Sequence, residues 1–467
     1  MSKEHKDISR RKFLGQASCA ALGTTTLFSS LLNMKALNAA AIDNSSLQMG
    51  YKAMVCLLLG GGNDSFNMLI PRGNTEYAQY SLTRSNLAIP QNNILGINAL
   101  NPDGQLYGVH PSMPQVQQLF ASERLAFLTN IGTLVEPTNK AQYYSGIHPL
   151  PLGLYSHFDQ TQQWMTGRPH ERSSTGWGGK IADLVQSLNS SQNVSMNISL
   201  SGTNVFQQGN DVIEYVIDQE GATGILGSDP DGWLFEQLTT QAVDNMLDAS
   251  YQDIYKKTYV NTMKQSRDAT ADFTEAIEAT DDLLTVFSEN DLSQSFRMIA
   301  KCLQAKDDLG FERQIFFINF DGWDHHDEVL LAQENMLGQL DAALGEFNAV
   351  LEELGMIDEV TTFTISDFGR TLTSNGNGTD HAWGGNVMAM GGAVKGGDIY
   401  GQYPSLELDN PLEVGGGVLI PTLSADQYFS ELGQWFGVSN SDLNEIFPNV
   451  IQFSDLNDGP PIGFMNI

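Results

Sequence analysis

The segment DGWDHHDE, which begins at Asp321, places two adjacent histidines among four carboxylates directly after an apolar run. Imidazole and carboxylate side chains are the ligands that zinc, manganese and iron use in proteins. Asp321 and His325 stand four residues apart at the predicted end of a strand, where the turning chain lets both side chains reach one point. A single such cluster is weak evidence, since an aspartate after a strand often caps the next helix. The spacing therefore becomes informative only if other clusters join it.

Four further clusters of polar residues lie at comparable places along the chain. They are GGGND with Asn63 and Asp64, YSHFDQ with Ser156, His157 and Asp159, SDFGR with Asp367 and Arg370, and GTDHAWGGN with Asp380, His381 and Asn386. Most of them begin or follow an apolar stretch. Polar groups at successive strand ends indicate a shared site, because ligands of open α/β sheets bind at the carboxyl ends of the strands.

Apolar runs and helical spacing predict the elements that carry these clusters. Residues 52–59 and 314–320 are continuous apolar runs, typical of strands buried on both faces. Apolar residues at steps of three and four predict a long helix that ends at Gly355, and residues 360–365 predict the next strand. Strand, helix and strand in this order form a right-handed crossover between parallel strands. The polar clusters after the two strands are therefore expected at one edge of the sheet.

The first forty residues have the order of a signal peptide. Arg10 and Arg11 precede an apolar stretch from Phe13 to Leu32, and small residues follow it. The paired arginines resemble a twin-arginine signal. The expected partner is the twin-arginine translocation machinery, and the expected location is periplasmic or extracellular. Removal of residues 1–40 would leave one α/β domain, residues 41–467, with an insertion around residues 185–310.

Charge and hydropathy argue against nucleic acid binding and against an integral membrane span. The formal net charge of the 467 residues is −31, which disfavours nucleic acid as a partner because its phosphates require lysine and arginine. No stretch after the signal is long and apolar enough for an integral membrane span. Cys56 and Cys302 are the cysteines that follow residue 40, and Cys56 lies inside an apolar run. Its setting favours a buried free thiol over a disulfide.

The order of these clusters resembles the alkaline phosphatase and sulfatase superfamily. It looks most similar to a family of twin-arginine-exported bacterial proteins in that superfamily, known as a domain of unknown function. The resemblance spans residue 52 to about residue 401, and its specific part runs from DGWDHH to TDHAWGGN. It implies an alkaline phosphatase-like three-layer sandwich, in which a central, mostly parallel sheet has helices on both faces and carries a peripheral insertion.

The resemblance also implies a divalent metal, whose identity stays open among zinc, manganese and calcium. The implied ligands are Asp321, His325 and His381 for one ion, and Asp64, Asp367 and the residue after it for a second ion. The chain departs from the pattern at that last position, where Phe368 replaces the expected histidine. Phenylalanine cannot bind a metal, so the second ion either uses another group, such as Asn63, Asp324 or Asp380, or is absent.

The nucleophile stays open between two neighbours. Ser156 is the conventional choice, since a hydroxyl is activated when it is coordinated to a metal. His157 would be a less usual covalent nucleophile, a ligand or a general acid. Arg370 is expected to contact an anion, because guanidinium matches tetrahedral oxyanions. The pattern has no counterpart of His326. Three roles stay open for it: contact with a metal ligand, contact with the substrate, or the start of the next helix.

These roles predict an exported, metal-dependent hydrolase of phosphate or sulfate esters, with a small or polymeric anionic ester as its substrate. The alternative is an exported binding or envelope-assembly protein on the same fold with a degraded catalytic site. Phe368 motivates this alternative, and a fold by itself does not establish an activity.

Overall fold

A computed structural model of the protein describes residues 50–222, 224, 228 and 231–467. Within it, Gly50–Ile467 forms one compact unit. The predicted export signal lies outside the described residues.

The secondary structure consists of twelve strands and eleven α-helices in the described part of the chain. The strands are β1 (Lys52–Gly60), β2 (Leu69–Pro71), β3 (Leu95–Ile97), β4 (Tyr107–Val109), β5 (Leu125–Gly132), β6 (Asn197–Ser199), β7 (Tyr215–Val216), β8 (Arg313–Asp321), β9 (Val360–Ser366), β10 (Gly385–Met390), β11 (Ile399–Tyr400) and β12 (Leu423–Ser424). The helices are α2 (Asn74–Arg84), α3 (Pro114–Ala121), α4 (Lys140–Ser145), α5 (His157–Thr166), α6 (Trp177–Val185), α7 (Leu234–Asp248), α8 (Ile254–Glu278), α9 (Asp291–Gln304), α10 (Val329–Leu354), α11 (Ala425–Phe436) and α12 (Asn440–Ile446).

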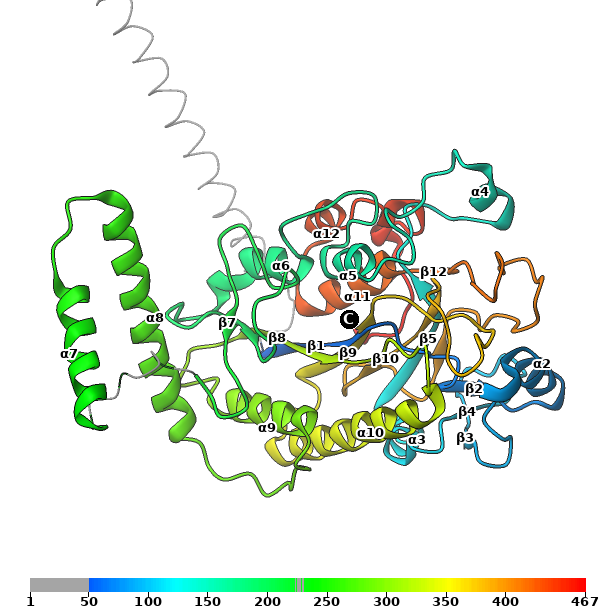
Figure 1. Ribbon diagram of the computed structural model, residues 1–467, viewed down its shortest axis with the longest axis horizontal. Coiled ribbons are helices and arrows are strands. Elements are labelled where there is room, and N and C mark those ends of the chain that lie inside the picture. Colours follow the sequence, from blue (N-terminus) through cyan, green and yellow to red (C-terminus); the bar gives the residue numbers. More distant parts are fainter. Residues whose placement is uncertain (1–49, 223, 225–227, 229–230) are drawn as a thin grey trace, which may run out of the picture. The chain divides into compact units, whose positions relative to one another are not determined.

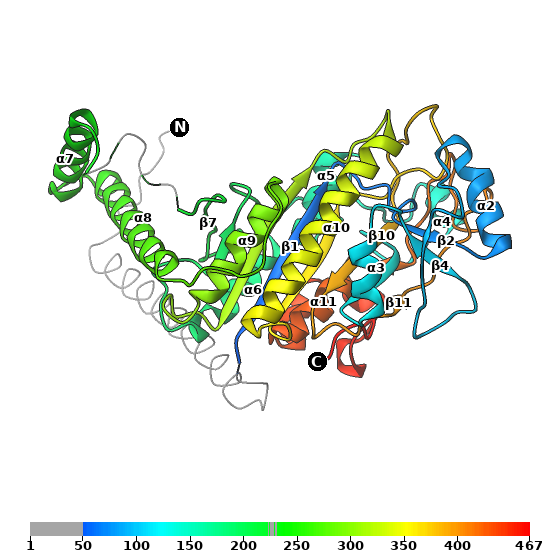
Figure 2. The ribbon, with the colours of Figure 1, turned by 90° about the horizontal axis from the view of Figure 1, so that it is seen from below.

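The central sheet has the order β11-β5-β10-β9-β1-β8-β6-β7, with β12 also paired to β5. Strand β10 is antiparallel to both of its neighbours, while the other pairs of this sheet are parallel. Helices α5, α6, α11 and α12 cover one face (Figure 1), and α3, α9 and α10 lie across the other (Figure 2). The predicted three-layer α/β architecture with a mostly parallel sheet is therefore confirmed.

The sheet is buried because helices cover both of its faces. Each residue of β1 after Lys52 is buried, and so is each residue of β9. This is the environment that their unbroken apolar runs predict. The long helix α10 buries Leu340, Leu344 and Phe347 and ends at Gly355, as its spacing predicts. The segment predicted as an insertion supplies β6 and β7 to the sheet edge, and α9 packs against α10.

Strand β1 lies between β8 and β9, and the three strands end together. Gly60 is opposite Asp321 on one side, and Leu59 is opposite Ser366 on the other. The carboxyl ends of all three strands therefore meet at one edge, as the crossover between β8 and β9 predicts. The loops that leave this edge carry most of the polar clusters described above.

Two smaller predictions can also be compared with the structure. Cys56 and Cys302 are both buried and free, so the free thiol predicted for Cys56 is confirmed. None of the described helices has the length and apolar character needed to cross a membrane.

A buried carboxyl in the first turn of α11 gives a prediction about stability. Asp426 is 1% exposed, and its Oδ2 has no hydrogen-bond partner among the described residues. Burial raises its pKa from the ordinary value of 3.8 to about 8. The unfolded chain loses this proton first, so the stability that the protonated carboxyl contributes is complete below pH 4 and lost as the pH rises through 8. The expected loss is about 1.4 kcal/mol for each pH unit in that window.

The substitution Asp426→Asn removes this ionisation and keeps the shape of the side chain. We expect the free energy of unfolding of the variant, relative to the unchanged protein, to increase from pH 5 to pH 8. Urea denaturation at each pH measures it, and Asp282→Asn, at an exposed aspartate, serves as the control. A difference between Asp426→Asn and the unchanged protein that stays constant with pH would contradict the prediction.

Candidate metal centre

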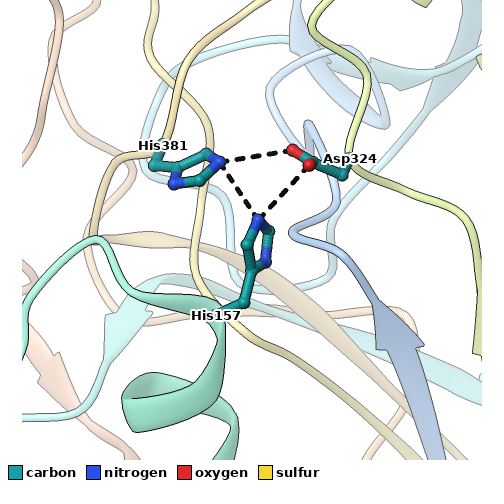
Figure 3. A group of neighbouring side chains, drawn as sticks. All are labelled: His157, Asp324 and His381. Carbon is teal, nitrogen blue, oxygen red and sulfur yellow. Dashed lines mark hydrogen bonds and ion pairs between the residues drawn. The ribbon is translucent and has the colours of Figure 1, made fainter.

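Three side chains from distant parts of the chain converge at the carboxyl ends of the central strands. His157 is the first residue of α5, Asp324 lies in the loop after β8, and His381 lies in the loop before β10 (Figure 3). One ligand atom from each lies within 4.8 Å of the others. The loop that carries Asp324 is held against the loop after β1. A Cβ atom on Gly61 would lie 2.6 Å from the backbone nitrogen of Asp324, so this close approach requires glycine.

The distances within the group match those between ligands of one ion. His157 Nε2 lies 3.0 Å from His381 Nε2. The carboxylate of Asp324 lies 3.4 Å from His157 Nε2 and 3.3 Å from His381 Nε2. Nitrogen and oxygen ligands bind zinc at about 2.0–2.2 Å, and such bonds place neighbouring ligand atoms roughly 3 Å apart.

In each of the two imidazoles, the second ring nitrogen, Nδ1, contacts an oxygen of the protein. His157 Nδ1 lies 2.7 Å from the carboxylate of Asp367, and His381 Nδ1 lies 2.8 Å from the backbone oxygen of Tyr155. These oxygens only accept hydrogen bonds, so each Nδ1 carries the proton. When the rings are neutral, both Nε2 lone pairs then face each other and the Asp324 carboxylate. A cation between the two Nε2 atoms and the carboxylate would be attracted by all three groups. Metal-binding histidines typically have a hydrogen-bond acceptor at their other ring nitrogen, as these two do.

Asp324 is kept ionised by its surroundings. Partial burial raises the pKa of this carboxyl, but the hydrogen bond and charge of Arg370, with His326 and His157, bring it below the ordinary value. Arg370 Nη1 lies 2.5 Å from Asp324 Oδ1. For His381, burial is the largest influence and lowers the pKa of the ring. A carboxylate beside a ring that favours its neutral form is the state that a metal ion requires.

The comparison with protein families identifies the chain. A family model described as "Protein of unknown function (DUF1501)" matches residues 51–442. The chain belongs to this family. No curated protein matches this DUF1501 chain.

Solved structures with remote similarity to this DUF1501 protein include sulfatases and phosphatases. The sulfatase PsFucS1 from Pseudoalteromonas sp. is 10% identical, with 87% of this chain and 72% of that chain covered and a TM-score of 0.35. The alkaline phosphatase PafA, solved as a mutant, is 12% identical, with 69% and 64% covered and a TM-score of 0.26. The lipoteichoic acid synthase LtaP from Listeria monocytogenes is 9% identical, with 82% and 80% covered and a TM-score of 0.27.

The DUF1501 structure brings together four of the eight residues predicted for the site. His157 and His381 face each other, Asp367 supports His157, and Arg370 pairs with Asp324. Both carboxylate oxygens of Asp367 have partners in the protein, since Oδ1 accepts a hydrogen bond of 3.2 Å from the backbone nitrogen of Gly61. Asp367 therefore acts on the group through His157.

Arg370 is an anchor of the loops around the group. It is 0% exposed, and it donates to Asp324, to the backbone oxygen of Gly61 and to both oxygens of Thr379. These contacts occupy the guanidinium with protein groups, so its predicted contact with an anion stays a prediction.

Ser156 caps helix α5. Its hydroxyl accepts a hydrogen bond from the backbone nitrogen of Asp159, 3.4 Å away. Ser156 directly precedes His157, the first residue of the helix. Its role as nucleophile stays a prediction.

The other three predicted residues lie outside the converging group. Asp321 ends β8 with an exposed side chain. Asp64 is buried and forms an ion pair with Arg84. The ring of His325 is buried, and its Nδ1 has no hydrogen-bond partner among the described residues. Their roles as metal ligands stay predictions.

Phe368 occupies a wall of the group. It is 2% exposed, and its ring centroid lies 4.8 Å from those of both His157 and His381. This apolar ring packs on the two imidazoles and helps to fix their orientation.

Sequence reasoning did not assign Asp324 and His326 to the main site. Both belong to DGWDHHDE, which the sequence singles out, but the pattern of the superfamily drew attention to Asp321 and His325 instead. After β8 the chain turns at Gly322, whose φ is 105°. This turn decides which of the neighbouring polar side chains face His381, and no spacing rule predicts its direction.

Proposed function

We propose that this protein is an exported, metal-dependent hydrolase of phosphate or sulfate esters, with the ion bound by His157, Asp324 and His381. The observation that carries the proposal is the convergence of two Nε2 atoms and one carboxylate, each supported from behind by the protein. Two imidazoles and one carboxylate are the protein ligands of several hydrolytic zinc sites, which keep another position open.

The chemistry of the group suits the cleavage of anionic esters. A divalent ion would polarise an ester oxygen and stabilise the charge that develops on it. Asp367 orients His157, and Arg370 keeps Asp324 ionised and in place. Ser156 lies next to His157 and is the nucleophile in this proposal. His157, Asp324 and His381 are 35%, 43% and 25% exposed in their side chains, so a substrate can approach from solvent.

Export is part of the proposal and comes from the sequence. Arg10 and Arg11 stand before an apolar stretch, and this arrangement supports twin-arginine translocation to the periplasm or beyond. Fusion of residues 1–40 to a folded reporter tests it, with Arg10→Lys and Arg11→Lys as a paired change. Export of the reporter that continues in the paired variant would contradict the twin-arginine route.

The hydrolase proposal is tested on purified protein. We expect a divalent metal to copurify, and we expect turnover of aryl phosphates or aryl sulfates that is lost on chelation and restored by the metal. Substitution Asp324→Asn should remove both the metal and the turnover, because the amide cannot replace the charged ligand. Turnover that survives in the metal-free protein would contradict the mechanism.

A second candidate is an exported protein that binds an anionic ligand through the metal and does not hydrolyse it. Phe368 supports it, since its ring replaces a ligand of the second ion that the superfamily pattern implies. Under this candidate, phosphate or sulfate binds to the metal-loaded protein in calorimetry, while the panels of aryl esters stay intact. Metal-dependent turnover in those panels would exclude it.

A further inference from the structure

His326 also contacts His381 and Asp324. Its Nε2 lies 2.9 Å from His381 Nε2 and 3.0 Å from Asp324 Oδ1. These separations are similar to the 3.0 to 3.4 Å found between His157, Asp324 and His381, and they suit ligands around one ion. The rings of His326 and His381 also pack together, with centroids 4.8 Å apart.

The protein holds His326 in the same manner as the other two imidazoles. Its Nδ1 lies 3.1 Å from the carboxylate of Asp380, and Asp380 accepts a hydrogen bond of 3.1 Å from Asn375. Asn375 also donates to the backbone oxygen of His326 at 3.1 Å. Gly378 packs so closely that a Cβ atom there would lie 2.2 Å from the carbonyl carbon of His326. The turn from Asn375 to Asp380 therefore clamps both the ring and the backbone of this residue.

The hydrogen bond to Asp380 determines where the free lone pair of His326 points. A carboxylate at Nδ1 favours the proton on that nitrogen, which leaves the lone pair of a neutral ring on Nε2. That lone pair faces Asp324 and His381. Three imidazole nitrogens and one carboxylate then point inward, and in each imidazole an oxygen of the protein supports the other nitrogen. Such outer partners are typical of metal sites.

We infer that His326 is a fourth ligand of the metal, so that one ion is bound by His157, His326, His381 and Asp324. The inference rests on the proposed metal site and deepens it, since an ion with four protein ligands would take the ester oxygen at a fifth position, an expansion that zinc allows. Three nitrogen ligands and one oxygen favour a transition metal such as zinc or manganese over calcium, which takes six to eight oxygen ligands. Phe368 packs an apolar ring against His157 and His381, so it offers no ligand to a second ion on that side.

The competing arrangement uses His326 as a cation. A protonated ring would pair with Asp324 at one nitrogen and with Asp380 at the other, and the metal would keep three protein ligands. The two arrangements differ in what the loss of the ring does to a bound ion. A fourth ligand contributes directly to affinity and to the geometry of the ion, whereas a charged neighbour repels the ion, so that its removal would leave affinity unchanged or increase it.

The test uses His326→Ala in the full chain, with Zn²⁺, Mn²⁺ and Ca²⁺ each supplied alone and Co²⁺ as a spectroscopic probe. We expect the unchanged protein to bind one Zn²⁺ and to retain no Ca²⁺ after dialysis. In the variant we expect Zn²⁺ affinity to fall at least about tenfold, the lower bound for loss of an outer partner of a metal ligand. The visible spectrum of bound Co²⁺ should also change, because its intensity depends on the coordination.

Two variants keep this test interpretable. His170→Ala changes an exposed histidine away from the group and should leave affinity and spectrum unchanged. Asp380→Asn keeps the imidazole of His326 and should weaken affinity less than His326→Ala does. The side chain of His326 is 45% exposed, so we expect the alanine variant to fold, which circular dichroism checks.

Unchanged or stronger Zn²⁺ binding in His326→Ala, an unchanged Co²⁺ spectrum or a preference for Ca²⁺ would overturn the inference. Its failure differs from failure of the proposed function. If the protein loses Zn²⁺ in His326→Ala but cleaves no ester, the fourth ligand stands and the hydrolase is rejected. If it cleaves esters while His326→Ala binds Zn²⁺ as before, the hydrolase stands and the fourth ligand is rejected.

Discussion

Replacing His381 by alanine is expected to abolish metal binding at micromolar concentrations and, with it, ester hydrolysis. His381 Nε2 faces both of the other imidazoles, 2.9 Å from His326 Nε2 and 3.0 Å from His157 Nε2. Loss of an outer partner of a ligand already lowers metal affinity about 10–100-fold. Loss of the ligand itself should therefore lower it by more than about 100-fold.

The measurement is metal content after dialysis together with titration by Zn²⁺, and turnover on aryl esters is followed in parallel. His170→Ala is the matched control, because it removes an exposed imidazole that lies outside the group. Burial lowers the pKa of His381, so the unchanged protein should keep its metal through neutral pH and release it only in acid. A His381→Ala variant that binds Zn²⁺ as tightly as the control would reject the site altogether.

The ion pair between Arg84 and Asp64 is expected to have a large effect on stability. Arg84 and Asp64 are 0% and 1% exposed in their side chains. Arg84 also donates to the backbone oxygen of Thr371 at 3.1 Å. The pair joins the end of α2 to the loops that follow β1 and β9. Arg84→Met should lower the free energy of unfolding by about 3–5 kcal/mol, because it leaves a buried carboxylate without its partner.

A double variant separates the cost of an unpaired charge from the value of the pair. Arg84→Met combined with Asp64→Leu should recover most of the lost stability, since apolar residues of similar size often replace a buried ion pair at little cost. The control is Arg267→Met, which breaks a pair whose side chains are 43% and 50% exposed and should cost less than about 1 kcal/mol. Urea denaturation measures all three.

The same variants test the predicted metal role of Asp64. If the carboxylate is held by Arg84 alone, the double variant should keep one Zn²⁺ per chain. A lower metal content in the folded double variant would instead support Asp64 as a ligand. A single variant Arg84→Met as stable as the unchanged protein would contradict the importance of the pair.

The sequence by itself determined the elements of this protein and the region of its site. Buried strands such as β1 and β9 require unbroken apolar runs, and α10 requires apolar residues at steps of three and four, so both kinds of element can be found from residue order. Parallel strands joined by a helix place their carboxyl ends together. For that reason the predicted edge, where the clusters after β8 and β9 meet, agrees with the structure, in which Arg370 pairs with Asp324.

Only the tertiary structure decided which side chains meet at that edge. DGWDHHDE offers six groups able to bind a metal, and the turn at Gly322 brings Asp324 and His326 toward His381 while Asp321 stays exposed at the end of β8. The direction of a loop depends on what packs against it, here the backbone of Gly61 and the turn from Asn375 to Asp380. Those contacts join residues far apart in the chain, and the order of residues does not contain them.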